Sequence, residues 1–380
     1  MNFDFSEEQK LLQKTARDYL TEHCPLSVAR SVLESSASHS PELWKGAGEM
    51  GWLGAAVPEV YGGAGFGYLE LSLLAEEVGR ALAPIPFSSS VYLATEALLL
   101  AGSEDQKSRH LPRLVSGERI GTLAWVERPG RPRAERIETR FDGSRLTGTK
   151  LPVPDGDVAG LAVVVAREGG GISLALVDLD GPGVQRSAVE CIDPSRSQGR
   201  LVFEGAPAER LGGAGQGSAL LERLFDRAAV LMAFEQIGGA QRAFEITRDF
   251  TLGRYAFGRP IASFQAVKHR LADLYVVIEL ARSNVYYGAW ALSHGSDELA
   301  TAACGARVGA SDAFELAGAE MIQLHGGVGF TWEYDCHLFY RRARWLAAAL
   351  GPAGTWREKL VARLVARQGA GAEPGELDAE

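Results

Sequence analysis

The chain has 380 residues, of which 46% are hydrophobic and 23% are charged, and its net charge is −9. This is ordinary globular composition, with enough length for two or three domains. The acidic balance and the lack of a basic stripe argue against nucleic acid as a partner. Apolar runs are too short and too interrupted to cross a bilayer, so no membrane association is expected.

The four cysteines lie far apart, with no pair at the Cys-x-x-Cys spacing. This pattern predicts reduced structural thiols, with no metal site and no disulfide framework. The acidic N-terminus lacks an apolar signal core. A cytoplasmic location is therefore expected.

The first segment, residues 1–118, is predicted to be a helical domain. Ser6 and Gln9 have the spacing of a capping box, and apolar residues recur after them at helical intervals. A second helix is predicted to start at Ser40-Pro41, because proline suits the first helical turn. Residues 69–83 and 89–100 predict two more helices, separated by Pro84-Ile-Pro86.

Residues 119–215 change from a helical to a strand period. Short β-rich runs are bounded by turn residues such as Asp142-Gly143 and Gly181-Pro182. They predict a small antiparallel sheet or barrel, with residues 212–217 as the linker out of it. The predicted strands are residues 120–126, 137–141, 146–151, 161–166, 173–179 and 199–203.

Residues 216–368 return to a helical period and predict a C-terminal four-helix bundle. The predicted fold class is α+β, mainly α. The tail, residues 369–380, is acidic and poor in apolar residues, which predicts disorder. The predicted bundle helices are residues 220–253, 262–293, 297–323 and 336–350, with a further one at 355–367.

Two motifs in the bundle segment resemble the flavin-binding signature of the acyl-CoA dehydrogenase family. They read Arg254-Tyr-Ala-Phe-Gly-Arg-Pro-Ile261 and Gln323-Leu-His-Gly-Gly-Val-Gly-Phe-Thr331. Trp52-Leu-Gly-Ala-Ala-Val-Pro58 and Glu76-Glu-Val-Gly-Arg-Ala81 match the same family earlier in the chain. The resemblance covers nearly the whole length, because motifs in all three parts agree in order and spacing.

The resemblance implies FAD as the cofactor, shared across a subunit interface. In the family, the β domain of one subunit holds the flavin ring, and the bundle of its neighbour holds the pyrophosphate and adenosine. Arginine offers a charged, forked donor to a pyrophosphate, and glycine allows close backbone approach. The residues assigned to this role are Arg254, Phe257, Gln265, Gln323, Gly326 and Gly327.

The β domain departs from the family where the flavin ring would lie. The Gly-Ser-Asp that follows the family's Thr-Glu-Pro is absent after Trp125-Val-Glu127. Pro152 and Pro154 replace the family's Trp and Thr after Gly148-Thr-Lys150. Proline has no backbone N–H and no hydroxyl, so donors to the ring are lost. A flavin ring in this chain's own β domain is therefore poorly supported.

Both usual positions of the family's catalytic glutamate lack a carboxylate. Leu350 occupies one and Ala228 the other, so no catalytic residue is assigned. Glu235 lies seven residues beyond Ala228, which is about 10 Å along a helix and too far to replace the missing base. The remaining acids weighed as a displaced base are Asp226, Glu127 and Glu333.

The first hypothesis is a non-catalytic subunit of a heteromeric acyl-CoA dehydrogenase, acting in fatty acid or steroid side-chain β-oxidation. It would complete the FAD site of a homologous partner, in a heterotetramer or related assembly. The substrate would be an acyl-CoA thioester bound through the complex, with an electron-transfer flavoprotein or similar protein as acceptor. The alternatives are a homo-oligomeric dehydrogenase with a displaced base, a flavin monooxygenase, and a non-redox thioester-binding or structural protein.

Two further features carry structural predictions. His325 lies inside the glycine motif and is interpreted as a packing residue. Arg341, Arg342 and Arg344 crowd one helix, which predicts a solvated or interface face. Arg342 stands where the family has an aspartate, and this change is interpreted as a mark of an altered subunit contact.

Overall fold

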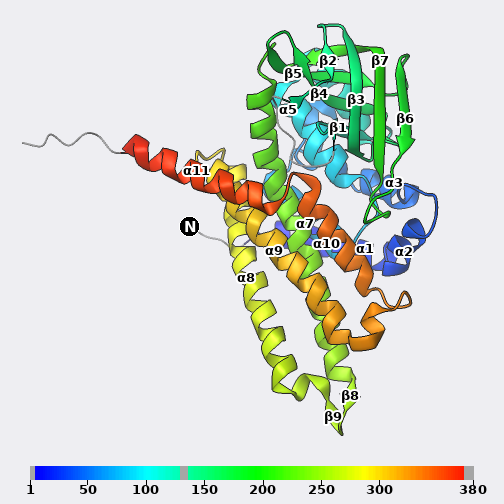
Figure 1. The fold of residues 1–380 in the computed structure, drawn as a ribbon, viewed down its shortest axis with the longest axis vertical. Coiled ribbons are helices and arrows are strands. Elements are labelled where there is room, and N and C mark those ends of the chain that lie inside the picture. The colour runs from blue at the N-terminus through cyan, green and yellow to red at the C-terminus, as the bar shows by residue number, and fades with distance from the viewer. Residues whose placement is uncertain (1–4, 129–135, 372–380) are drawn as a thin grey trace, which may run out of the picture.

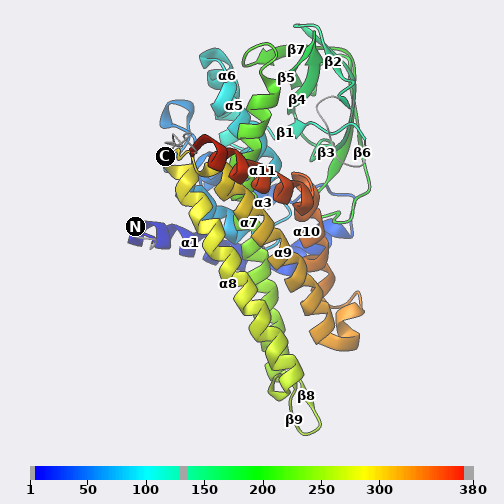
Figure 2. The ribbon, with the colours of Figure 1, turned by 60° about the vertical axis from the view of Figure 1, so that its left-hand side comes forward.

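The computed structural model describes residues 5–128 and 136–371, and its shape follows the three segments of the sequence (Figure 1). The β region lies at one end of the molecule, and the long helices of the bundle run away from it toward the β8–β9 hairpin at the other end (Figures 1 and 2). The predicted mainly helical layout with a central β region is confirmed. Within the described residues, no helix is both long and apolar enough to span a membrane.

The N-terminal domain is helical, as predicted. Ser6 accepts a hydrogen bond from the backbone of Gln9, whose side chain accepts one from the backbone of Ser6, so the predicted capping box is confirmed. Ser40 caps the helix that begins at Pro41, also as predicted. The elements are α1 Glu7–His23, α2 Leu26–Leu33, α3 Pro41–Glu49, η1 Trp52–Gly54, η2 Glu59–Tyr61, α4 Tyr68–Arg80, η3 Ser88–Thr95, α5 Glu96–Ala101 and α6 Glu104–Val115.

The central region forms a seven-stranded sheet among the described residues. Its pairings β4–β2, β2–β3, β3–β7, β7–β5 and β5–β4 close a ring, so the sheet is a barrel. Most of these pairings are antiparallel, as predicted, whereas β4 pairs in parallel with both β1 and β2. The strands are β1 Gly121–Ala124, β2 Arg140–Phe141, β3 Arg145–Pro154, β4 Leu161–Glu168, β5 Gly171–Asp178, β6 Val184–Ala188 and β7 Gln198–Leu211.

Strand β6 was missed because it is short and mostly exposed, with no apolar run to indicate it. Strand β7 extends well beyond the predicted residues 199–203. Its later half pairs with β5, and that tertiary pairing, not local sequence, sets its length.

The C-terminal part is a bundle of long helices, as predicted. The helix α11 continues to Gly371, so the predicted disordered tail begins too early, and residues 372–380 lie outside the described residues. The elements are α7 Gly217–Gly253, β8 Tyr255–Ala256, β9 Arg259–Pro260, η5 Ile261–Ser263, α8 Gln265–Ser293, α9 Leu299–His325, η6 Gly326–Phe330, α10 Cys336–Ala349 and α11 Ala353–Gly371.

Helix α4 of the N-terminal domain crosses α7 of the bundle at very close range. A Cβ on Gly79 would lie 1.9 Å from the carbonyl oxygen of Glu235, and one on Gly238 would lie 1.9 Å from that of Glu76. Only glycine permits this approach. The crossing brings Glu235, on the buried face of α7, to the junction of the N-terminal domain, the β region and the bundle.

A buried network of two arginines and two carboxylates fills that junction. Arg196, from the β6–β7 connection, donates to Glu235 at 2.7 Å and to Ser88 of η3. Arg342 of α10 donates to Asp193 at 2.6 Å and to Ser195 at 2.9 Å.

The same network also reaches the N-terminal domain and excludes water. Arg342 donates to the backbone carbonyls of Leu82 and Ala83, at 3.3 and 3.5 Å. The side chains of Arg196 and Arg342 are each only 1% exposed. One network therefore joins all three parts of the chain.

This placement corrects the prediction for Arg342. The residue was expected on a solvated or interface face, with a possible role in subunit contact, yet it is buried inside the chain. Arg341 and Arg344 do keep more exposed positions, where Arg341 donates to the carbonyl of Ile192 and Arg344 pairs with Glu315. The helical spacing separates them, because neighbouring residues point to different faces of α10.

We predict that Asp193→Asn lowers the free energy of unfolding by about 3 kcal/mol, because it leaves the buried guanidinium of Arg342 without its carboxylate. The control is Glu315→Gln, which breaks the exposed pair with Arg344 and should cost less than about 1 kcal/mol. Urea denaturation at neutral pH measures both. Equal losses for the two variants would contradict the role given to the buried network.

Candidate functional site

The residues predicted to bind FAD gather at the far end of the bundle. Arg254 and Phe257 lie in the β8–β9 hairpin, which joins α7 to α8 (Figure 1). Gln265 is the first residue of α8, and Gln323 lies in the last turn of α9. Gly326 follows that turn and begins η6. These residues form a surface that we call the bundle end; their role in binding stays a prediction.

A ring stack brings the two motifs together. The ring of His325, at the end of α9, stacks on Phe250 in the last turn of α7, with centroids 4.1 Å apart. The backbone N–H of Arg254 donates to the carbonyl of Phe250 and ends the helix there. His325 is buried, and its Nδ1 lies 2.7 Å from the carbonyl oxygen of Met321. These contacts agree with its interpretation as a packing residue.

The hairpin presents its functional groups outward. The backbone of Ile261 donates to the carbonyl of Arg254, which closes the hairpin. The guanidinium of Arg254 makes no hydrogen bond or ion pair with another described residue, and the side chain is exposed. Phe257 is 94% exposed, and its φ of 55° is one that non-glycine residues rarely adopt. An unpaired cation beside an exposed ring suits an anionic, aromatic group brought by a partner.

The glycine pair leaves open space at the same surface. Gly326 has a φ of 64°, which favours glycine, and a Cβ on either Gly326 or Gly327 would meet no atom within 4 Å. The space over this backbone is therefore open to a ligand or a second chain. Arg270 pairs with Glu320 and ties the start of α8 to the end of α9, so Gln265 and Gln323 lie on neighbouring helix ends.

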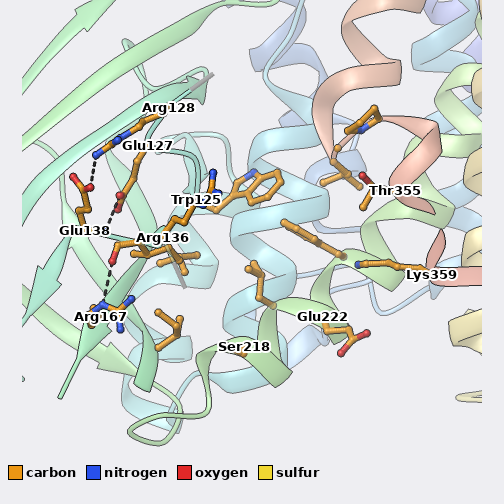
Figure 3. Close-up of a pocket in the computed structure, with 18 of the residues that line it drawn as sticks. Trp125, Glu127, Arg128, Arg136, Glu138, Arg167, Ser218, Glu222, Thr355 and Lys359 are labelled. Carbon is orange, nitrogen blue, oxygen red and sulfur yellow. Dashed lines mark hydrogen bonds and ion pairs between the residues drawn. The ribbon is translucent and has the colours of Figure 1, made fainter. Parts of the chain in front are cut away.

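A second feature is a cavity of about 1070 Å³ between the β barrel and the bundle (Figure 3). Trp125 packs edge-on against Phe225 of α7, with ring centroids 4.8 Å apart, and Leu350 closes part of the wall. Lys359 reaches toward the cavity from α11 (Figure 3). We call this the barrel–bundle pocket.

The two positions of the missing base lie in different surroundings. Leu350 lines the barrel–bundle pocket, so a carboxylate there would face the cavity. Ala228 is fully buried within α7 and is not part of the lining. The assignment of Leu350 and Ala228 to the family's two base positions stays a prediction, and so does the conclusion that the chain has no catalytic carboxylate.

The acids weighed as a displaced base are mostly engaged elsewhere. Glu235 is buried in its pair with Arg196, outside the pocket. Asp226 forms a paired contact with both terminal nitrogens of Arg363. Of the four candidates, only Glu127 lines the pocket.

Glu127 is held as an ion by its neighbours. Burial alone would raise the pKa of Glu127, but the ammonium of Lys150 at 2.8 Å and the backbone N–H groups of Glu138 and Thr139 outweigh it, and the pKa is about 2. Burial lowers the pKa of Lys150 to about 8, despite its bond to Glu127. A carboxylate with so low a pKa is a weak proton acceptor.

Sequence reasoning missed the cations of the pocket. The high density of arginines in residues 128–140 could have indicated most of these cations. Nothing in the sequence indicated Lys359, because only the docking of α11 brings it to the cavity. Three glutamates of the lining were also missed, namely Glu138, Glu222 of α7 and Glu358 of α11. The basic residues that line the pocket are Arg128, Arg136, Arg140, Arg167 and Lys359.

The two features cannot serve one cofactor molecule within one chain. Phe225 lies near the start of α7 and Arg254 directly after its end, with one continuous helix between them. At 1.5 Å per residue they are roughly 40 Å apart, beyond the reach of a dinucleotide. If FAD binds at the bundle end, the same molecule does not reach the barrel–bundle pocket of this chain.

We predict a pH-dependent effect of Glu127→Gln on stability. The pKa of Glu127 is depressed in the folded state, so its ionised form stabilises the fold above about pH 4.5, and this contribution is lost as the pH falls toward 2. The difference in unfolding free energy between wild type and variant should therefore shrink over that interval. Urea denaturation at a series of pH values measures it, and a constant difference would contradict the ion pair.

Comparison with known proteins agrees with this geometry. The N-terminal domain of acyl-CoA dehydrogenases matches residues 6–118, and their C-terminal domain matches residues 215–365. The chain is 34% identical to the acyl-CoA dehydrogenase IpdE2 of Mycobacterium tuberculosis over 345 residues, which cover 90% of this chain and 93% of the relative.

Two solved structures extend the likeness to the fold. The Tcur3481–Tcur3483 steroid acyl-CoA dehydrogenase variant shares 32% identity at a TM-score of 0.86, covering 96% of this chain and 99% of that one. A chain of the ChsE4–ChsE5 complex of Mycobacterium tuberculosis shares 29% identity at a TM-score of 0.87, covering 98% and 100%. From these matches and the bundle-end motifs, the chain belongs to the acyl-CoA dehydrogenase family, whose members bind FAD.

Proposed function

We propose that this chain is a non-catalytic subunit of a heteromeric acyl-CoA dehydrogenase and that its bundle end completes the FAD site of a homologous partner. The observation that carries the proposal is that the two ends of α7 offer different groups to a cofactor. The bundle end keeps an unpaired Arg254 beside open glycines, whereas the barrel–bundle pocket, roughly 40 Å away along α7, has Leu350 in its lining where a carboxylate would face the cavity.

The bundle-end residues fit a dinucleotide by their chemistry. Arg254 supplies two parallel N–H donors for a pyrophosphate, and the glycine backbone allows close approach. Gln265 and Gln323 offer amides to ribose or phosphate oxygens. Phe257 offers an exposed ring face to the adenine side. No described carboxylate contacts Arg254, so none competes for the guanidinium.

The pocket of this chain is a poor place for the family's reaction. When bound, FAD would supply a hydride acceptor for the oxidation of an acyl thioester, and the family's reaction also needs a carboxylate that takes the α-proton. Leu350 has no group that takes a proton, and Glu127 is committed to Lys150. The catalytic carboxylate and the ring pocket are therefore assigned to the partner.

The likeness to heteromeric relatives supports a homologous partner of the same fold. One similar structure is a complex of two named chains, ChsE4 and ChsE5. Another is a steroid acyl-CoA dehydrogenase, which favours a bulky, ring-bearing acyl-CoA thioester as substrate. An electron-transfer flavoprotein or similar protein is the proposed acceptor, and the cytoplasm the proposed location.

One observation favours the alternative of a self-sufficient enzyme. Glu358 of α11 lines the pocket together with Leu350, and it is the carboxylate to which this alternative would assign the displaced mechanism. That alternative requires FAD in the chain expressed alone and loss of its activity in Glu358→Gln. A chain that remains free of FAD when expressed alone contradicts it.

We predict that Arg254→Ala weakens FAD binding by the complex about tenfold or more, because a charge-assisted contact to the pyrophosphate is lost. Assembly should persist, since the side chain makes no contact within the described chain. The measurement is bound flavin absorbance after gel filtration, together with the molecular mass of the complex.

The matched control for this variant is Arg248→Ala. Arg248 is also exposed near the end of α7, but it already pairs with Asp249. It should leave the flavin content unchanged. If Arg254→Ala retained as much FAD as this control, the bundle end would have no role in the cofactor site.

A further inference from the structure

We infer that Trp332, held by Arg30 and Glu34 at the end of α2, positions the glycine turn of the bundle end for a cofactor. The glycine turn is Gly326–Phe330, the short helix η6 between α9 and α10. The inference rests on the proposed function and deepens it. It assigns an effect on the FAD site to residues of the N-terminal domain, far in sequence from the bundle-end motifs.

The glycines of the turn are not fixed by side-chain packing. A Cβ at Gly326 or Gly327 would meet no atom within 4 Å. Glycine also restricts its own backbone less than any other residue does. The shape that the turn offers to a ligand therefore depends on how its two ends are held.

Helix α9 holds the first end of the turn. Gly326 follows directly after His325, whose ring stacks on Phe250 with centroids 4.1 Å apart. A Cβ on Gly329 would lie 2.4 Å from the carbonyl oxygen of Ile322, so the turn lies against the last turn of α9. This end depends only on contacts within the bundle.

The N-terminal domain holds the second end, beside α2 (Figure 1). Thr331 follows the turn, and its backbone N–H and its hydroxyl both donate to the carbonyl of Val328, at 3.1 and 2.9 Å. Trp332 comes next, and its indole Nε1–H donates to the carboxylate of Glu34 at 2.6 Å. Arg30 donates to the backbone carbonyl of Trp332 at 2.7 Å. We call Arg30, Glu34 and Trp332 the clamp.

Neighbouring groups fix the plane of the Trp332 ring. The ring of His337, in the first turn of α10, stacks on it with centroids 4.4 Å apart and an angle of 13° between the planes. The guanidinium of Arg341 lies 5.6 Å from the ring centroid. Arg30 also donates to Asp335 through Nε and Nη2, at 3.1 and 2.6 Å, which ties the residue before α10 to the same helix.

The clamp would act by preorganisation. A turn that is already ordered loses less conformational freedom when it binds a ligand, so its affinity is higher. Its backbone N–H groups then face phosphate oxygens without rearrangement. Glu34 and Trp332 are both exposed, so loss of the clamp should alter the cofactor site more than the stability of the fold.

The test is titration of the flavin-free heteromeric complex with FAD, followed by the change in flavin fluorescence. Glu34→Ala and Trp332→Phe should each weaken FAD binding about threefold to tenfold, because each removes the same hydrogen bond. The double variant should bind no more weakly than the weaker single variant, since one bond cannot be lost twice. Glu34→Gln keeps an acceptor for the indole N–H and should restore the wild-type affinity.

The control is Glu49→Ala. Glu49 pairs with Lys45 four residues before it on α3. Glu34 pairs with Arg30 at the same spacing, but of the two glutamates only Glu34 also accepts from a tryptophan. The inference would be overturned if both clamp variants bound FAD as tightly as this control, or if Glu34→Gln bound it as weakly as Glu34→Ala. Additive losses in the double variant would overturn it too.

Arg254→Ala, titrated in parallel, separates this inference from the proposed function. If Arg254→Ala weakens FAD binding and the clamp variants do not, the bundle end binds FAD without help from the clamp, and only the inference fails. If Arg254→Ala binds FAD as tightly as wild type, the proposed function fails and the inference falls with it.

Discussion

The structure depends on one buried ionic network at the meeting point of its three parts. Arg342 holds Asp193, and Arg196 holds Glu235, with almost no exposed surface on either pair. Removing such charges from water is costly, so each pair is stable only with both partners present. Because the four residues come from α7, α10 and the β6–β7 connection, the network sets how the barrel sits on the bundle. It thereby sets the walls of the pocket between them.

Helix α7 connects this network to the barrel–bundle pocket on one side and to the bundle end on the other. Its first turns carry Phe225 into the pocket, its middle carries Glu235 into the network, and its end leads to Arg254. A helix of this length keeps the pocket and the bundle end far apart. A chain built this way can contribute to two sites at once, but not to both halves of one FAD molecule. The proposed sharing of FAD between subunits is compatible with this geometry, and the leucine at the base position of the pocket is the reason for proposing unlike subunits.

Much of the architecture was readable from the sequence because it depends on local signals. The capping box at Ser6, the helix start at Pro41 and the helical periods of the bundle are set by residues near one another in the chain. The motifs at Arg254 and Gln323 likewise lie on adjoining helix ends, in agreement with the single site that the family resemblance implied. Their gathering depends on the stack of His325 on Phe250, which joins residues distant in sequence.

The misses share a physical cause, which is pairing at long range. Nothing local distinguishes Arg342 from Arg341, and the buried position is tolerable because Asp193, distant in sequence, supplies a carboxylate to its guanidinium. Strand β4 pairs in parallel with β1 because the chain crosses between them, and no period in the sequence records that direction. The cations of the pocket were overlooked for the same reason, since Lys359 arrives there from a helix more than a hundred residues beyond Phe225 in the chain.

The most direct measurement of the shared cofactor is flavin per chain. The chain would be purified alone and then together with a homologous acyl-CoA dehydrogenase subunit, and bound flavin would be quantified by absorbance against protein concentration. Little flavin on the chain alone, and one FAD for every two chains in the complex, is the result predicted for a subunit that completes its partner's site. One FAD on every chain expressed alone would contradict that role and would assign this subunit a cofactor of its own.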